Sequence, residues 1–373
     1  MITVFDSELR WDPCVSHRGS EAVDFISEYF ALPDRRVLLL AGAGFDPRST
    51  VVPVKLSAVA KSLRALYIQE NRPNPTQELL ARAKQNRCTL ERAVREHLVL
   101  PVDIFGAGSI AVTGGRNVVR KLSQHALDGT TDVVIDTSAL SVGTSFPIIR
   151  YFAELIRGGR GPANLHVFVA HDPKLDAGIR SIPSDAPGYV HGYRGRSTLD
   201  GAASAAKLWL PQLAAGRSNA LRQLFDFVVP HDTCPILPFP ATDPQLVDTL
   251  AAEYLVELEN TWAVDTRNIV YADEGDPLDL YRTILKLDDL RRPVFAETGG
   301  SLLVLSPLGS KVMALGALMA ALERDLPVAH LESMGYDLCA SVPNTMPEPN
   351  LIHVWLEGEV YPAGQSTLEA SGA

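Results

Sequence analysis

The sequence predicts an α/β fold, and three features of the chain lead to that class. Short runs rich in Val, Ile and Leu are nearly continuous rather than alternating, which is typical of strands buried on both faces. Each run ends in small or polar residues, and a stretch with helical spacing of apolar residues follows it. Strands that alternate with helices favour a parallel sheet. We therefore expect a Rossmann-like fold of two packed α/β halves, with helices on both faces of the sheet.

The expected elements follow from these runs in chain order. Residues 36–48 and 163–173 each predict a strand with a polar exit, and residues 131–159 predict a strand followed by a helix. A further strand and helix are expected within 267–290. Residues 299–333 predict a strand, a long helix and a last strand.

Two segments stand outside this alternation. Residues 71–98 predict a helical arm with Thr76 as its N-cap, suited to contact a second copy of the chain or a partner protein. Its apolar residues near helical spacing are Leu79, Leu80, Ala83, Leu90, Val94 and Leu98. Residues 173–205 are rich in Pro, Gly and Ser and predict a long exposed loop.

A proline-rich stretch, residues 234–245, predicts an extended crossover between two domains. We place the boundary after residue 235, which gives an N-terminal Rossmann-like domain (1–235) and a C-terminal one (236–373). The net charge is −10, and the acidic excess lies in the C-terminal third. Because phosphate groups require counter-charge, this excess makes nucleic acid a possible but not a favoured partner.

Composition and missing motifs exclude several classes of protein. No run of 18 apolar residues occurs, so no membrane span is expected, and the N-terminal stretch lacks the features of a secretory signal. The four cysteines are far apart and form no CxxC pair, which indicates reduced thiols rather than a zinc site. GxSxG and HExxH are also absent. We expect a cytoplasmic protein, and its abundance of Ala, Arg, Leu, Asp and Pro is typical of GC-rich bacteria.

Ligands of parallel sheets bind outside the carboxyl ends of the strands, so the loops at those ends are the candidate sites. In the first loop, Gly42 and Gly44 allow close approach of a ligand, and Asp46 and Arg48 follow them. Arg48 offers a two-pronged donor for a phosphate or carboxylate. The run is not the dinucleotide fingerprint GxGxxG, because Pro47 replaces the third glycine. The alternative is a turn in which Asp46 caps a helix and pairs with Arg48.

The second candidate loop follows the strand that ends at Asp136. Thr137 and Ser138 come next, and their hydroxyl and N–H groups suit a phosphate or a sugar. A strand that ends in Asp-Thr-Ser resembles the opening of PIN-domain ribonucleases, and the resemblance implies that Asp136 binds a metal ion. Those nucleases need several converging carboxylates, of which Asp172 is the candidate second. The alternative is capping of the following helix by Ser141 or Thr144.

A cluster of acids forms the third candidate loop. Asp273, Glu274, Asp276 and Asp279 fall within seven residues, which suits Mg²⁺ or the hydroxyls of a ribose. The alternative is a helix N-terminus, because acids in a first turn favour the helix dipole and Pro277 suits the first helical position.

The fourth loop joins a buried strand to a helix through Ser306, Gly309, Ser310 and Lys311. Free backbone N–H groups, a glycine and a lysine together predict an anion site. GxxxxGK[ST] is missing, so the loop is not a Walker A motif. Residues 299–320 resemble the last ligand-facing loop of CARF domains, Rossmann-like sensors of cyclic oligonucleotides in prokaryotic antiviral systems. The resemblance implies a nucleotide ligand; Ser306-Pro307 stands where that family often has paired glycines.

Three functions remain open from the sequence. The favoured one is a sensor or accessory subunit that recognises a nucleotide or another phosphorylated molecule, without a known cofactor. Its candidate ligand-binding residues are Gly42, Gly44, Asp46, Arg48, Thr137, Ser138, Ser306, Gly309, Ser310 and Lys311. The second is a Mg²⁺-dependent nuclease or phosphodiesterase that uses Asp46, Asp136, Glu274 and Asp276. The third is a non-catalytic scaffold whose helical arm, 71–98, meets an oligomeric or heterologous partner.

Overall fold

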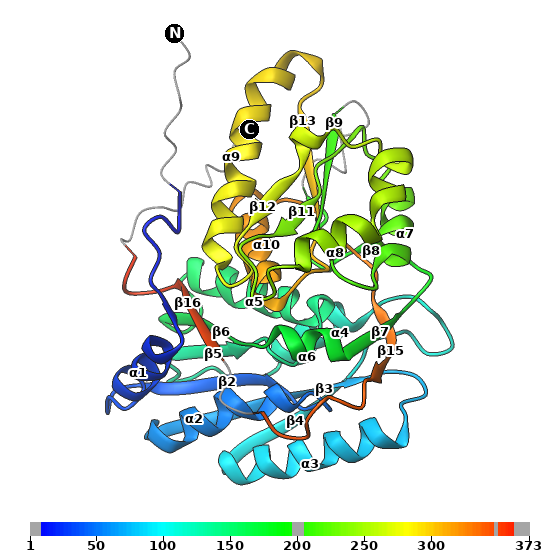
Figure 1. Cartoon of the computed structure of the whole chain (residues 1–373). Helices are drawn as coiled ribbons and strands as arrows, with labels where there is room; N and C mark the ends of the chain where they lie inside the picture. The colour runs from blue at the N-terminus through cyan, green and yellow to red at the C-terminus, as the bar shows by residue number, and fades with distance from the viewer. Residues whose placement is uncertain (1–8, 196–204, 347–349, 362–373) are drawn as a thin grey trace.

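The computed structural model describes residues 9–195, 205–346 and 350–361, and it confirms the α/β class. A seven-stranded sheet forms the first unit, in the lower half of Figure 1, in the order β1-β16-β6-β5-β2-β3-β4. Strands β2 to β6 are parallel, whereas β16 runs antiparallel to both β6 and β1. The bounds are β1 Ser16–Arg18, β2 Arg36–Gly42, β3 Ser62–Asn71, β4 Glu96–Asp103, β5 Asp132–Asp136, β6 Asn164–His171 and β16 Asn350–Glu357.

Both faces of this sheet are buried, which explains the continuous apolar runs. In β2, Leu38 and Leu40 pack into a cluster with α4 and α5, while Val37 and Leu39 pack on the other face with α1, α2 and α3. The helices are α1 Ser20–Tyr29, α2 Val51–Val59, α3 Gln77–Ala93, α4 Gly114–Leu122 and α5 Val142–Arg157. Alternate residues of one strand therefore enter two different cores.

The second unit is a smaller parallel sheet, in the upper half of Figure 1. Strand β9 lies between β10 and β13, and β11 pairs with β12. Two isolated parallel bridges extend this sheet. Gln212–Ile236 joins β11 to the chain just after β9, and Leu305–Val328 adds the segment at Val328 beside β13. Across the sheet the order is therefore β12, the β10–β11 segment, β9, β13 and the segment at Val328. Its elements are β9 Ala206–Pro211, α7 Ser218–Val228, β10 Asp232–Thr233, β11 Ile236–Pro238, α8 Leu246–Glu253, β12 Val270–Ala272, α9 Pro277–Phe295, β13 Ser301–Ser306 and α10 Lys311–Arg324.

The two units repeat one topology. In both, the five parallel strands lie in the order third, second, first, fourth, fifth along the chain. The order reverses between β2 and β5 in the first unit and between β9 and β13 in the second, and ligands of such sheets bind at this point. Helix α10 packs against α5 and β6, and one hydrophobic core contains residues from both sheets. The two units share their strand order, but no repeat of residues in the sequence indicates this.

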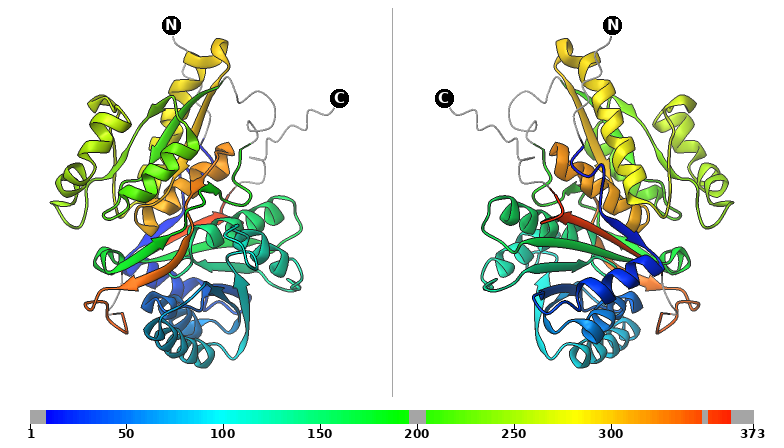
Figure 2. Two further views of the ribbon diagram at one scale, coloured as in Figure 1. Left: turned by 90° about the vertical axis from the view of Figure 1, so that its right-hand side faces the viewer. Right: turned by 90° about the vertical axis from the view of Figure 1, so that its left-hand side faces the viewer.

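The chain passes twice between the units, and the two passages pair with each other. Strand β7, Ile179–Pro183, is antiparallel to β15, Ser333–Leu338, and β8, Gly188–Tyr189, is antiparallel to β14, Ala329–His330. The β7–β15 pair forms a two-stranded ribbon beside the contact between the units (Figures 1 and 2). The long loop expected at 173–205 is thus wrong for its first part, which contains helix α6, Pro173–Gly178, and two strands; residues 196–204 lie outside the described part.

The helical arm expected at 71–98 is also corrected. Its helix is α3, which Thr76 caps by accepting a hydrogen bond from the Leu79 N–H, at an N···O distance of 3.3 Å. Both ends of the range belong to strands, because Asn71 closes β3 and Leu98 lies in β4. The segment is therefore a crossover of the first sheet, with Leu79 and Leu90 buried. Its role as a contact for a second copy or partner stays a prediction.

The structure also bears on the expected domain boundary, on membrane spans and on the cysteines. The proposed boundary after residue 235 falls between β10 and β11 of one sheet, and β16 returns the chain to the first unit. A division of the chain into two domains at that residue stays a prediction. Within the described residues, no helix has both the length and the apolarity that a membrane crossing requires. All four cysteines are free.

Val229→Gly is expected to stabilise the protein by about 1 kcal/mol. Val229 ends α7 with φ 49° and ψ 64°, a left-handed conformation that a β-branched side chain adopts at a cost of about 1–2 kcal/mol. Its side chain is 66% exposed, so its removal loses little burial. Urea denaturation measures the change. Val256→Gly is the control, because Val256 is 63% exposed but has φ −66°, and there glycine should destabilise by about 1 kcal/mol. An equal loss in both variants would contradict the prediction.

Candidate ligand cleft

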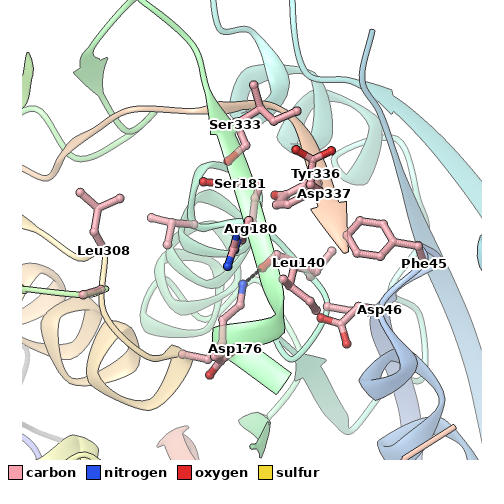
Figure 3. A pocket seen from close by; sticks show the side chains of 18 of the residues that line it. Phe45, Asp46, Leu140, Asp176, Arg180, Ser181, Leu308, Ser333, Tyr336 and Asp337 are labelled. Atoms are coloured by element: carbon pink, nitrogen blue, oxygen red, sulfur yellow. Dashed lines mark hydrogen bonds between the residues drawn. The ribbon is translucent and has the colours of Figure 1, made fainter. Parts of the chain in front are cut away.

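The carboxyl ends of both sheets open onto one cleft between the units. Its volume is about 1750 Å³, which exceeds the roughly 300–1,000 Å³ of ordinary small-molecule pockets. The loops after β2, β3 and β5 line it from the first unit, and the loops after β9 and β13 line it from the second. Both strands of the β7–β15 ribbon also contribute, and Figure 3 shows part of this lining. The cleft therefore joins the two ligand-binding positions that the topology predicts.

Asp46 and Arg48 form a closed ion pair in the wall of the first unit. Asp46 accepts hydrogen bonds from the Arg48 backbone N–H at 2.9 Å, from Nε at 3.0 and 3.2 Å, and from Nη2 at 2.8 Å. Arg48 Nη1 donates to Asp176 at 2.6 Å. Burial alone would lower the pKa of this guanidinium, but Asp46 and Asp176 raise it above its ordinary value. The structure thus shows the capped turn of the alternative interpretation, and ligand contact by Arg48 stays a prediction.

The second arginine of this wall is also neutralised. Arg72 follows β3, and its guanidinium lies 2.9 Å from the Glu70 carboxylate and 3.0 Å from that of Glu332. Glu70 in turn accepts hydrogen bonds from the N–H and the hydroxyl of Ser141, at 3.0 and 2.8 Å. Burial would raise the pKa of Glu70, but Arg72 and these donors lower it. The wall of the first unit therefore holds its buried cations in ion pairs.

The second unit contributes the predicted Ser-Gly-Ser-Lys loop. Ser310 caps α10 by accepting a hydrogen bond from the Met313 N–H at 3.2 Å, and the Gly309 N–H donates to Gln212 at 3.3 Å. The Lys311 ammonium donates to the carbonyl of Leu140 in the first unit. Burial lowers the pKa of Lys311, and the nearby Arg48 lowers it further. This cation has no carboxylate partner among the described residues, so an anion in the cleft would favour its charged form.

Arg217 is a cleft residue that the sequence analysis missed. It precedes α7 at the end of the loop after β9, and its side chain lines the cleft. No hydrogen bond or ion pair within residues 9–195, 205–346 and 350–361 involves its guanidinium. Burial lowers its pKa, although Tyr336, Tyr254 and Asp176 raise it. Such a cation, beside the N–H groups of a helix N-terminus, is suited to bind a phosphate or carboxylate.

Arg217 and Arg48 occupy equivalent places in the repeated topology. Arg48 stands six residues after the end of β2, and Arg217 stands six residues after the end of β9. Two positions before Arg48 lies Asp46, which neutralises it, whereas Ala215 stands two positions before Arg217. This difference is visible in the sequence once β9 is known. The strand was not predicted because its apolar run, LWLP, is short and ends in proline.

The predicted ligand-binding residues divide into two groups. Six of them line the cleft: Gly44, Asp46, Arg48, Gly309, Ser310 and Lys311. The other four are packed beneath it: Gly42, Thr137, Ser138 and Ser306. A Cβ at Gly42 would lie 2.8 Å from the Ala139 carbonyl oxygen, so this glycine permits close packing of two loops. The Ser306 hydroxyl accepts a hydrogen bond from Trp209 at 2.9 Å, and that of Thr137 donates to the Phe168 carbonyl at 3.2 Å.

The four acids of the enzyme hypothesis have separate partners. Asp136 accepts hydrogen bonds from the N–H and hydroxyl of Ser138 at 3.0 and 2.5 Å, and burial raises its pKa to about 7. Glu274 accepts one from the Thr242 N–H at 2.9 Å. Asp276 caps α9 and pairs with Arg18. Within the described residues, no group of three or more His, Cys, Asp or Glu side chains is arranged to hold a metal ion.

Comparisons with known proteins give distant structural likenesses. No protein-family model matches the chain, and no curated protein matches it. A type III CRISPR defence DNA nuclease activated by cyclic oligoadenylate is similar with a TM-score of 0.45 and 11% identity, over 80% of this chain and 66% of the nuclease. The cytoplasmic domain of a prokaryotic cation chloride cotransporter and a universal stress protein from Archaeoglobus fulgidus DSM 4304 each give a TM-score of 0.24. They share 11% and 9% identity, over 80% and 79% of this chain and 96% of each of those chains. No functional statement follows from likenesses this distant.

Proposed function

We propose that the cleft binds a phosphorylated small molecule of nucleotide type, and that the protein is a sensor or accessory subunit without turnover. The observation that carries this proposal is Arg217, a cation that lines the cleft and has no acidic hydrogen-bond or ion-pair partner among the described residues. Lys311 and the N-terminus of α10 lie in the same wall of the second unit. Together they attract an anion through charge and through free N–H groups.

The resemblance of residues 299–320 to a ligand-facing loop of CARF domains supports a role in a prokaryotic defence system, with a nucleotide as the signal. A cytoplasmic location and assembly with further copies or a partner protein belong to the same proposal. The acids Asp46, Glu274 and Asp276 have partners of their own, which gives the sensor preference over the Mg²⁺-dependent enzyme.

A binding screen of wild type and Arg217→Gln tests the proposal. The panel contains inorganic phosphate, mono- and dinucleotides and cyclic oligonucleotides, each with EDTA and with Mg²⁺. A ligand at 100 times its Kd should stabilise the wild type by about 2.7 kcal/mol, measured as a thermal shift in EDTA. Arg217→Gln should weaken that ligand by about 2 kcal/mol, roughly 30-fold, because a buried charge contact is lost.

The control is Arg267→Gln, since Arg267 is exposed and lies outside the cleft lining. Chromatography of the bound compound should recover it unchanged. The absence of a thermal shift with every compound of the panel would overturn the proposal. Equal binding by wild type and Arg217→Gln would do so as well. Binding that requires Mg²⁺, with conversion of the ligand, would establish the enzyme instead.

A further inference from the structure

We propose that Phe45 and Tyr336 form a stacking subsite for a planar heteroaromatic ring, so that the ligand is a nucleotide rather than a sugar phosphate. This inference rests on the proposed function, because it assigns the second end of the same ligand. The two side chains come from the loop after β2 and from β15, and both are half-buried in the lining of the cleft. Their ring centroids lie 5.1 Å apart, with 51° between the planes. Figure 3 shows them together on one side of the cleft, opposite Leu308.

The charges of this wall favour a neutral ring over a second anion. Arg72 lies over the Tyr336 ring with its guanidinium carbon 5.2 Å from the centroid. Glu70 and Glu332 neutralise Arg72, and Asp46 and Asp176 neutralise Arg48. These four carboxylates leave the guanidinium groups of Arg48 and Arg72 with no net positive charge to offer an anion. A flat ring instead gains dispersion with the aromatic faces and loses little hydration.

The second unit supplies the complementary half of the recognition. Arg217 and Lys311 lie there without carboxylate partners within the described residues, so the anion of the ligand belongs to the second unit. A cleft of about 1750 Å³ has room for both ends of such a ligand. The cleft therefore orients its ligand, with the phosphate toward α7 and α10 and the ring toward β15. Polar groups at the edge of the ring site come from the ribbon, where Arg180 stands opposite Asp337.

Calorimetric titration with matched ligands tests the subsite. The ligands are the four ribonucleoside monophosphates, ribose 5-phosphate and inorganic phosphate, and the variants are Phe45→Leu and Tyr336→Leu. Stacking of one base is worth about 1–3 kcal/mol, so the best nucleotide should bind about 5- to 150-fold more tightly than ribose 5-phosphate. Phe45→Leu should remove most of this ratio and leave the Kd of ribose 5-phosphate unchanged within about twofold.

Phe239→Leu is the control, since Phe239 is an exposed aromatic that pairs with Tyr271 outside the cleft lining. Phe45→Trp keeps a stacking face, and its fluorescence should be quenched by the nucleotide but not by ribose 5-phosphate. Equal affinity for nucleotides and ribose 5-phosphate in the wild type would overturn the subsite and leave the proposed function intact. An unchanged ratio in Phe45→Leu would do the same. Failure of every phosphate compound to bind would instead overturn the proposed function.

Discussion

Arg48→Ala is expected to lower the free energy of unfolding by about 3–5 kcal/mol. Removal of one partner from a buried ion pair leaves the other charge without compensation, which is the origin of a cost of that size. Arg48 is 2% exposed and Asp46 is 8% exposed, so solvent screens their interaction little. The variant would also leave Asp176 without its guanidinium partner. Urea denaturation at neutral pH measures the loss.

The chain contains its own control for this prediction. Asp265 and Arg267 form the same local pair, with Arg267 Nε at 3.0 and 3.2 Å from the carboxylate oxygens and Nη2 at 2.6 Å. The Asp265 side chain also accepts from the Arg267 N–H, as Asp46 does from Arg48. This second pair is exposed to solvent, so Arg267→Ala should leave the urea midpoint unchanged. Equal effects of the two substitutions would show that burial does not decide the strength of the Asp46–Arg48 pair.

Acid is expected to destabilise the protein below about pH 6.5, because its buried histidines are held neutral. Three histidines, of which His166 and His353 are buried, form a chain across β1, β16 and β6 on the face of the first sheet that packs against α1. His17 Nδ1 lies 2.9 Å from His353 Nδ1, His353 Nε2 lies 3.1 Å from His166 Nδ1, and His166 Nε2 lies 3.3 Å from Asp132 Oδ1. Burial lowers the pKa of His166, although Asp132 raises it, and burial together with the neighbouring His166 and His17 lowers the pKa of His353. Burial also lowers the pKa of His330 in the cleft.

The sign follows from the protons that each state binds. Below pH 6.5 the unfolded chain protonates His166, His330 and His353 and the folded protein does not, so these histidines make stability rise with pH until about pH 7. Asp136 acts in the opposite direction, since burial raises its folded pKa to about 7 and the folded protein holds that proton. The histidines with a lowered pKa outnumber this one group, so the unfolded chain binds more protons than the folded protein between pH 6.5 and the folded pKa values of the histidines. Stability therefore falls as the pH falls through that range.

Urea denaturation from pH 5 to pH 8 measures this profile. His353→Phe keeps an aromatic ring against Phe25 and Phe168 and removes one titrating group, so its slope should be smaller by about 1.4 kcal/mol per pH unit. Asp136→Asn removes the opposing group, so its slope should be larger by a similar amount. A flat profile in the wild type would refute the prediction.

Much of the fold was predictable because its signals are local. The strands β2, β5, β6, β12 and β13 lie within the predicted apolar runs, and α5, α9 and α10 follow where helices were expected. Thr76 caps its helix as predicted. The strands that were missed carry weaker local signals. β3 mixes polar with apolar residues, β4 contains Pro101, and β16 is an eight-residue strand with a histidine in it. Their burial depends on neighbours that are distant in the chain.

The cleft was only partly predictable, for the same reason. The strand-end rule located the loops of Asp46 and Lys311, which do line one cleft. It also selected Thr137, Ser138 and Ser306, whose hydroxyls are used inside the protein, because a strand-end position does not say which side chains point outward. Tyr336 had no signal, since it follows the last predicted strand and reaches the cleft through the ribbon.

The alternation of strands and helices, the Thr76 cap and the glycine-bearing turns were predictable from the order of residues, because apolar periodicity and capping act over a few residues. Which cations remain available to a ligand depends instead on contacts between distant parts of the folded chain. Arg48 is closed off in part by Asp176, which lies 128 residues away in the chain, while Arg217 meets no such partner within the described residues. The free energy of an ion pair depends on distance and burial in space. Neither the distance nor the burial can be read from the order of residues, because both depend on how the two sheets pack together.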